Sequence, residues 1–399
     1  MNQILKRTKG DQVIWGVVIV LSCISVLTVF SATRSLEYRV YGQNTGYYLI
    51  KQLFFLALGL AIIYFVHKVN YNKFARIAIL MYILSIPLLL YTLFFGVSLN
   101  EGSRWVRLPG TSIGIQSSDM AKLALFLFLA RILSMKQAVI KDLWKGFIPV
   151  LIPVLLTCAL IAPANMSTAL MLGFTCSILF FIGRVQIKHL LLLVLIGIVG
   201  IISIYAISKV THFGRASTWE KRITSFMGKA DDKDKKPDDE FQVQQAKIAI
   251  AYGGVLGRGP GNSLQRNILP HIDSDFIYAL IIEEYGIVGG IIVMFLYLLF
   301  LWRSILIFKR CPFAFGAFLA VGLSITLVFQ AMLNMAVNVH LVPVTGLTLP
   351  LVSMGGSSIL FTSVAIGVIL SVSKYVDEME GKKKAEAAVE VAEQKQKKK

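Results

Sequence analysis

The fold is decided by one stretch, Ser274-Asp275-Phe-Ile-Tyr-Ala-Leu-Ile-Ile-Glu283-Glu284-Tyr-Gly286, which opens an apolar run that continues to residue 303. About 20 apolar residues cross the hydrocarbon core of a bilayer as a helix, so the run 275–303 predicts a membrane-spanning helix. Its first turns nevertheless carry acidic side chains, and ionisable groups at membrane depth are costly unless they serve a function or a partner. These acidic residues are therefore the first candidates for a functional site.

Apolar runs of similar length recur along the whole chain. Hydrophobic residues make up 56% of the 399 positions and the mean hydropathy is +0.70, more than the core of a soluble protein requires. The pattern predicts an all-α polytopic integral membrane protein with about ten transmembrane helices. The predicted spans are 14–31, 48–66, 75–95, 119–134, 147–163, 167–183, 188–208, 275–303, 313–337 and 356–374.

Lysine and arginine residues cluster in the short loops that follow the second, fourth, sixth and eighth spans. Because basic residues are retained on the cytoplasmic side, this alternation predicts that both termini are cytoplasmic. It places one long extracytoplasmic loop, 209–274, between the seventh and eighth spans. We expect residues 1–374 to form a single transmembrane domain, and the Lys-rich segment 375–399 to form a disordered cytoplasmic tail.

Other compositional signals exclude several classes of site. The net charge of +18 comes from basic residues in the inner loops and the tail, which indicates topology and attraction to anionic lipid rather than a nucleic-acid partner. The four cysteines and five histidines are scattered without the spacing of metal ligands. The glycine-rich segment 253–261 lacks the spacing of a nucleotide-binding loop, so we expect no nucleotide cofactor.

Polar residues gather in three places on the predicted outer side. The first comprises Gly102-Ser-Arg104-Trp105 and Gln116-Ser-Ser-Asp119-Met-Ala-Lys122, which lead into the fourth span. Polar side chains at this depth indicate a loop that dips into the membrane beside other helices. The alternative is an interfacial anchor made by the Arg-Trp pair.

The second polar cluster lies on the helix that opens at Asp275. Glu283 follows eight residues later, which corresponds to about 80° of rotation and roughly 12 Å of rise, whereas Glu284 points about 180° away. Asp275 and Glu283 are thus expected to face one cavity, and Glu284 to brace a neighbouring helix. Two alternatives stay open: the glutamates serve structure alone, and Asp275 is the N-cap of the helix.

The third cluster runs from Asn338 to Ser358. Two prolines and three glycines disfavour a regular helix there. The segment ends in Gly355-Gly356-Ser357-Ser358 before an apolar run, which offers backbone amides and hydroxyls at a helix N-terminus. Such a terminus suits either a phosphate group or simple helix capping.

Taken in order, these motifs resemble the SEDS family (shape, elongation, division and sporulation), the polytopic peptidoglycan polymerases typified by FtsW and RodA. The resemblance covers nearly the whole chain. The segment Thr345-Gly-Leu-Thr-Leu-Pro-Leu-Val-Ser353 is more similar to the division branch, FtsW, than to the elongation branch, RodA, which stays the alternative. The matching segments are Gly102–Trp105, Gln116–Lys122, Gln242–Gln245, Gly253–Gly254, Gly259–Gln265, Ser274–Ile277, Glu283–Gly286 and Asn338–Ser358.

The chain also departs from the family pattern. Where the family usually has Gln-Pro-Ser-Glu, this chain ends the motif in Asp119, which keeps a carboxylate on a shorter arm. Asn165 replaces an aspartate of the Pro-Asp-x-Gly-Thr motif, which keeps the capacity for hydrogen bonding but removes the charge. The usual Tyr before Gly-Gly-Ser-Ser is Met354.

The resemblance implies a glycosyltransferase that joins lipid II, the undecaprenyl-pyrophosphate-linked disaccharide peptide, into a β-1,4 glycan. It implies that Asp275 is the catalytic base and that Arg104 and Lys122 neutralise the departing pyrophosphate. The remaining substrate-binding candidates are Asp119, Glu283, Glu284, Asn338, Ser353, Gly355, Gly356, Ser357 and Ser358.

The resemblance also implies a setting and partners. A divalent cation, Mg²⁺ or Mn²⁺, is expected, with Asp275 and Glu283 as candidate ligands. The location would be the cytoplasmic (inner) membrane of a bacterium, with the active site on the extracytoplasmic face. The expected partners are a class B penicillin-binding protein, which is a transpeptidase, and other membrane proteins of the divisome.

Two other functions are compatible with the residues. A lipid II flippase would also have broken helices and buried charges, but no inverted repeat is visible and the candidate charges gather on one side of the membrane. A non-catalytic divisome scaffold that recruits a transpeptidase would tolerate replacement of all the outer charges. An assay of glycan polymer formation distinguishes a polymerase from both of these alternatives.

Overall fold

The computed structural model describes residues 10–40, 46–99, 102–107, 114–211, 219–220, 222, 226, 237–269 and 272–397. Its helices are α2 (Gln12–Val40), α3 (Gly46–Lys68), α4 (Asn72–Phe95), α5 (Ser117–Lys136), α6 (Ile148–Ile161), α7 (Met166–Ile182), α8 (Ile187–Thr211), α10 (Pro237–Gly253), α11 (Ile277–Arg310), α12 (Ala314–Asn338) and α13 (Ser357–Lys397). A π-helical turn, Leu143–Phe147, precedes α6, and a 3₁₀ turn, Gln265–Asn267, lies between α10 and α11.

The helices are those of a multi-pass membrane protein, and each predicted span lies on one of them. Among the described residues, seven helices are long and apolar enough to cross a bilayer: Gln12–Thr33, Gly46–Lys68, Asn72–Phe95, Leu143–Ile161, Ile277–Arg310, Ala314–Asn338 and Ser357–Lys382. Two shorter apolar helices follow, Met166–Ile182 and Ile187–Ser203. The predicted all-α polytopic class is confirmed.

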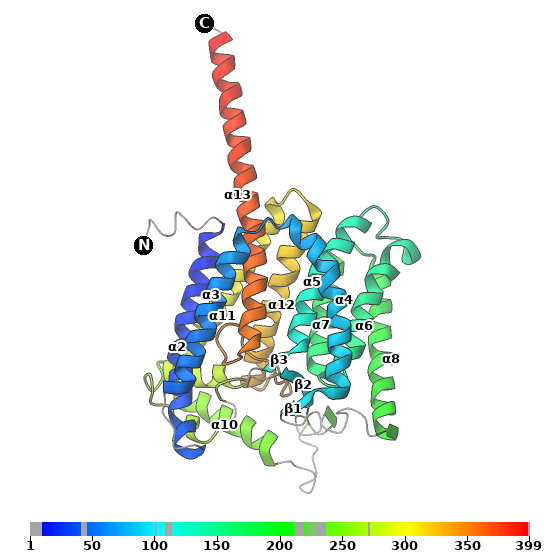
Figure 1. Ribbon diagram of the computed structural model, residues 1–399. Coiled ribbons are helices and arrows are strands. Elements are labelled where there is room, and N and C mark those ends of the chain that lie inside the picture. The colour runs from blue at the N-terminus through cyan, green and yellow to red at the C-terminus, as the bar shows by residue number, and fades with distance from the viewer. Residues whose placement is uncertain are drawn as a thin grey trace.

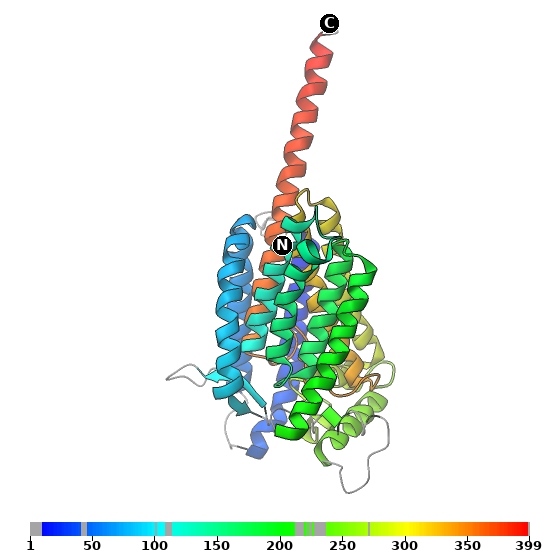
Figure 2. The ribbon, with the colours of Figure 1, turned by 90° about the vertical axis from the view of Figure 1, so that its right-hand side faces the viewer.

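The membrane helices stand side by side in one bundle, and its two ends differ (Figure 1). The strands and α10 lie at one end, called here the sheet end, while α13 extends beyond the other, called the tail end. Figure 2 shows the same separation from the side. Helices α11 and α12 pack against each other, α13 packs on α3, and α10 packs on α11. The strands and α10 therefore lie together at the sheet end.

The C-terminal segment differs from the prediction. Residues 375–399 were expected to be disordered, but α13 continues without a break to Lys397. A helix that is already nucleated by a membrane span avoids the cost of the first turn, and the Ala, Glu and Lys residues of this segment are good helix formers. High charge alone therefore did not predict disorder correctly here.

A small antiparallel sheet occupies the loop that was expected to dip into the membrane. Strands β1 (Val97–Leu99), β2 (Gly102–Arg107) and β3 (Gly114–Gln116) pair in the order β1-β2-β3. Trp105 pairs with Gln116, the last residue before α5. The sheet thus leads the chain directly into the helix that carries Asp119 and Lys122.

Helix α11 is broken at Gly286, whose φ of 71° and ψ of −177° are not helical. The glycine-rich loop before α11 packs its backbone into the break. The amides of Arg258 and Gly259 donate to the carbonyls of Glu283 and Glu284 at 3.0 and 2.9 Å, and the amide of Ile287 donates to Gly254 at 3.0 Å. We call residues 253–259 against residues 282–288 the clasp. It replaces the helical hydrogen bonds that the break removes.

The clasp leaves no room for a side chain at its centre. A Cβ atom at Gly286 would lie 2.1 Å from the carbonyl oxygen of Val255, and one at Gly253 would lie 2.0 Å from that of Ile282. Both obstacles are backbone atoms, which cannot rotate away. Glycine is therefore required by contact at both positions, and at Gly286 by conformation as well.

We expect Gly286→Ala to lower the thermal unfolding midpoint of the detergent-solubilised protein clearly. The backbone conformation at residue 286 is nearly restricted to glycine and costs about 1–3 kcal/mol for other residues, before the clash with Val255 is counted. Gly173→Ala is the matched control, because a Cβ at Gly173 in α7 meets no atom within 4 Å. Equal midpoints for the two variants would contradict the account of the clasp.

Candidate functional site

The site is organised by a row of three amide side chains on α12. Gln330, Asn334 and Asn338 are spaced four residues apart, so they lie on one face of the helix. All three are buried, with 5%, 1% and 1% of their surface exposed. Buried amides in an apolar helix need hydrogen-bond partners. The hydrogen-bond partners of these three amides include two non-helical segments at the sheet end, one around Asp275 and one from Val339 to Gly356.

Two of these amides hold the backbone at Asp275. The Nδ2 atoms of Asn334 and Asn338 donate to the Asp275 carbonyl at 2.9 and 3.0 Å. The Oδ1 atom of Asn338 accepts the amide of Ala279 at 2.9 Å, in the first turn of α11. Asn338 was predicted to bind substrate, but its two polar atoms are engaged with the backbone. Its observed contacts are those of a residue that positions the start of α11.

The segment before α13 holds the preceding two residues in the same way. The hydroxyl of Ser353 donates to the Ser274 carbonyl at 2.6 Å, and the amide of Met354 donates to the Asp273 carbonyl at 2.9 Å. Three successive carbonyls are thus fixed from two sides. Ser353, another predicted substrate-binding residue, is a second positioning contact.

Asp275 itself is half-buried, and α11 begins after it. The cap position of α11 is Phe276, whose side chain makes no capping hydrogen bond, and the amide of Ala279 is instead accepted by Asn338. With its backbone fixed, the carboxylate of Asp275 has a defined position at the opening of the helix.

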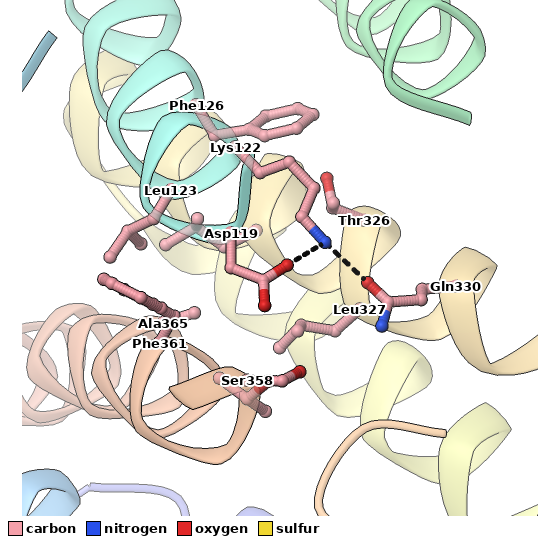
Figure 3. A pocket seen from close by; sticks show the side chains of 12 residues that line it. Asp119, Lys122, Leu123, Phe126, Thr326, Leu327, Gln330, Ser358, Phe361 and Ala365 are labelled. Atoms are coloured by element: carbon pink, nitrogen blue, oxygen red, sulfur yellow. Dashed lines mark hydrogen bonds and ion pairs between the residues drawn. The ribbon is translucent and has the colours of Figure 1, made fainter. Parts of the chain in front are cut away.

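A buried ion pair lies one helical turn along α12 from this segment (Figure 3). The Nζ atom of Lys122 lies 2.8 Å from Oδ1 of Asp119 and donates to Oε1 of Gln330 at 3.1 Å. Gln330 in turn donates to the Thr348 carbonyl at 2.9 Å. Side chains one turn apart on a helix have Cβ atoms about 6 Å apart, so Gln330 and Asn334 link the ion pair to the Asp275 segment.

The ion pair lines a pocket between α5, α12 and α13 that also includes Phe126, Phe361 and Ser358 (Figure 3). Its volume of about 40 Å³ has room for a few water molecules. Oδ2 of Asp119 is buried without a hydrogen-bond partner among the described residues. The pocket thus combines apolar walls with one cation and one carboxylate oxygen that can still accept a hydrogen bond.

The predicted glycine-serine motif begins α13 at the edge of this pocket. Ser358 lines the pocket, and its amide donates to the Gly355 carbonyl at 2.7 Å. The Ser357 hydroxyl accepts the amide of Gln116 at 3.2 Å, which ties β3 to α13. Gly356 has a positive φ of 39°. The structure therefore brings this motif together with Asp119 and Lys122.

The two glutamates of α11 have structural partners. Glu283 is fully buried, and its carboxylate accepts the hydroxyl of Ser263 and the amides of Leu264 and Gln265, the latter two at 2.8 and 3.3 Å. Glu284 accepts the hydroxyl of Ser31 and so braces α2, as the sequence indicated for a neighbouring helix. Glu283 thus anchors the loop that follows the clasp.

The contacts of Glu283 limit its use as a ligand for the divalent cation that the sequence resemblance implies. Both oxygens of Glu283 are occupied by donors from residues 263–265. Among the described residues, no group of three or more His, Cys, Asp or Glu side chains is placed to hold a metal ion. The donor set around Asp275 therefore does not fit a cation held by the protein alone.

Sequence reasoning missed Gln330 and Asn334. The signal was present, because both are polar residues inside an apolar span, four residues apart and in line with Asn338. Arg104 lies on β2, and its side chain is outside the described residues. Asn165 caps α7 by accepting the amide of Thr168 at 3.3 Å, which needs no charge.

Comparison with known proteins places the chain in a family. The sequence model of the family of FtsW, RodA and SpoVE proteins, which is described as "cell cycle protein", matches residues 11–378. The chain belongs to this family. Stage V sporulation protein E of Bacillus subtilis (strain 168) is 33% identical over 380 residues, 93% of this chain and 98% of that protein. A probable peptidoglycan glycosyltransferase FtsW of Nitrosococcus halophilus is 33% identical over 369 residues, 91% and 92% of the two chains.

Solved structures of the family have the same fold. A chain of a peptidoglycan synthase complex that coordinates polymerization and crosslinking superposes with a TM-score of 0.69 at 24% identity, over 92% of this chain and 98% of that one. The rod shape determining protein RodA of Thermus thermophilus gives a TM-score of 0.65 at 23% identity, over 92% and 97%.

We expect Glu283→Gln to loosen the loop that Glu283 anchors. The amide group of glutamine presents a donor where the native carboxylate accepts the amides of Leu264 and Gln265. Losing hydrogen bonds to a charged group costs roughly 1.5–3 kcal/mol each, so trypsin should cleave after Arg258 and Arg266 at least about tenfold faster. Glu378→Gln on the exposed part of α13 is the control. Unchanged cleavage in the first variant would show that Glu283 does not anchor the loop.

Proposed function

We propose that this chain is a peptidoglycan glycosyltransferase that polymerises lipid II into β-1,4 glycan strands. The observation that carries the proposal is the α12 amide row, which fixes the Asp275 backbone one turn from the buried Asp119–Lys122 pair. Transfer of a glycosyl group from a pyrophosphate needs a base and a cation held in fixed relation, and this arrangement supplies both. Curated relatives named probable peptidoglycan glycosyltransferase FtsW support the same reaction.

In the proposed reaction, Asp275 accepts the proton of the acceptor hydroxyl while that oxygen attacks the anomeric carbon of the donor sugar. The new C–O bond forms as the bond from the anomeric carbon to the pyrophosphate breaks. A single displacement inverts the α-linked donor to a β product, so base and leaving group must lie on opposite sides of the sugar. The Asp275 carbonyl accepts two hydrogen bonds and the Ser274 carbonyl accepts a third, so the backbone that carries the proposed base is fixed.

Lys122 is proposed to stabilise the departing pyrophosphate. An ammonium group has three donors, and Asp119 and Gln330 account for two of them. The apolar walls of the pocket lower the local dielectric constant and so strengthen the interaction of Lys122 with a phosphate. We propose that Arg104 assists from β2, the strand that leads towards this site. Because the described residues offer no group of three or more side chains to hold a divalent cation, we propose that any cation that takes part is bound largely by the pyrophosphate, and we assign it no step.

The setting that best accommodates this reaction is the bacterial cytoplasmic membrane, with the sheet end facing outwards. The lysines and arginines of the loops at the tail end support this orientation. We further propose a class B penicillin-binding protein as the partner, since a structural relative belongs to a synthase complex that couples polymerization to crosslinking. Septal synthesis with other divisome proteins is favoured over elongation by the segment Thr345–Ser353 and by the relatives named FtsW.

We expect Asp275→Asn to lower the rate of glycan formation by about 10²–10⁴-fold, because asparagine keeps the size of the side chain and cannot accept the proton. The assay uses purified lipid II and the protein in liposomes with its cognate transpeptidase, and the product is resolved as a glycan ladder. Asp273→Asn, two residues away in the same turn, is the matched control. Normal ladders from Asp275→Asn would exclude Asp275 as the base, and no ladder from the folded native chain would favour a flippase or a scaffold.

Paired substitutions separate the structural role of Lys122 from its proposed chemical role. Lys122→Met should destabilise the protein by roughly 3–5 kcal/mol, because it leaves the Asp119 charge buried without its partner. The double variant Asp119→Asn/Lys122→Met removes that charge and should recover the unfolding midpoint, but not polymerisation. Recovery of both stability and polymerisation in the double variant would mean that Lys122 does not act on the pyrophosphate.

A further inference from the structure

Helix α10 has an apolar face that no other described part of the chain covers. Its opposite face is buried against α11 through Ala246 and Ala249, which are 1% and 0% exposed. The uncovered face continues into the loop after the helix. It consists of Phe241, Ile248, Tyr252, Val255 and Leu256, which are 39%, 37%, 54%, 67% and 81% exposed.

The end of this face is held rigidly in its exposed position. Val255 and Leu256 lie between Gly254 and Gly257, whose φ values of 51° and 80° turn the chain outwards on both sides. The carbonyls of Gly254 and Val255 accept the amides of Ile287 and Val288 at 3.0 and 3.4 Å. Two large apolar side chains are therefore presented by a fixed backbone, beside the first residues of α11 after its break.

Those residues of α11 belong to the surface that faces lipid. Ile287, Val288, Ile291 and Phe295 are 46%, 44%, 52% and 59% exposed on a membrane-spanning helix. About 20 residues of helix cross the roughly 30 Å hydrocarbon core. Counted back from Arg303 at the tail end, this length reaches Glu283, so residue 287 lies inside the apolar layer. The Val255–Leu256 tip lies beside that layer.

Cationic groups border the apolar face, as an interfacial position requires. Lys247 is exposed on α10 among the apolar residues. Arg258 is exposed just after the tip, and its guanidinium lies 5.3 Å from the ring centre of Tyr252. Long basic side chains beside an aromatic ring can reach lipid phosphates while their stems stay in the apolar region. This combination favours lipid over a protein partner, which would also have to cover the adjacent lipid-facing surface of α11.

We propose that the exposed face of α10 and the Val255–Leu256 tip lie in the membrane, at the boundary between headgroups and acyl chains of the leaflet at the sheet end. The clasp joins this lipid contact to α11, and the same loop continues to Asp275. The contact therefore holds the segment before Asp275 at the depth of the lipid headgroups. The inference needs only the membrane setting and does not depend on the proposed reaction.

Spin labels on the full-length chain in nanodiscs of phosphatidylethanolamine and phosphatidylglycerol test this position. One label is placed at Leu256→Cys or at Tyr252→Cys, in a background with Cys23→Ala and Cys311→Ala. Phe295→Cys on the lipid-facing side of α11 is the reference for lipid, and Asn262→Cys in the outer loop is the reference for water. The background variant without an introduced cysteine is treated with the same spin label, which checks that Cys158 and Cys176 do not react.

At residues 252 and 256 we expect collisions with dissolved oxygen to exceed those with a water-soluble nickel complex several-fold, as at residue 295, with the reverse order at residue 262. Nickel collisions that match residue 262 would place the tip in water and overturn the proposal. Low collision rates for both reagents would also overturn it, because a second copy or another protein would then cover the tip. Two independent label sites guard against a local effect of either substitution.

Discussion

The sheet end depends on the need to satisfy backbone polar groups where water is scarce. Membrane helices satisfy their own hydrogen bonds, but the turn at residues 273–275 and the segment before α13 do not. The amide row of α12 supplies the missing donors. Asn334 donates hydrogen bonds to the carbonyls of Asp275 and Leu347, and Gln330 donates one to the carbonyl of Thr348. Without these side chains, neither irregular segment would be stable at this depth.

In the clasp, backbone polar groups are satisfied by other backbone groups alone. At Gly286 the helix loses its own hydrogen bonds, and the glycine-rich loop returns them through contacts that only glycine permits. The polar residues of the spans thus fall into two groups. Glu283 and Asn338 have their hydrogen-bonding atoms occupied, Glu283 by two backbone amides and the Ser263 hydroxyl, whereas Asp119 keeps an oxygen without a partner among the described residues. The second kind of residue is the better candidate for binding a ligand.

The sequence predicted the parts of the fold that depend on local pattern. Each span predicted from hydropathy lies on a helix, because about 20 apolar residues leave few alternatives to a membrane helix. The position of Asp275 at a helix opening could also be predicted. The partner of Glu283 could not, since Ser263 and the amides beside it are brought near only by the break at Gly286. Likewise, the sheet order and the contact of Lys122 with Gln330 depend on packing between distant segments.

The same contacts indicate where the pocket can widen. A pyrophosphate is larger than the few waters that about 40 Å³ admits. Moving α12 would break the bonds of Gln330 to both Lys122 and Thr348, and would also release Asp275 from Asn334. The start of α13 is held to its neighbours by longer contacts, 3.2 Å from Gln116 to Ser357 and 3.4 Å between the hydroxyls of Thr348 and Ser358. An opening on the α13 side would leave the bonds of Gln330 and Asn334 in place, and with them the link between the Asp275 backbone and Lys122.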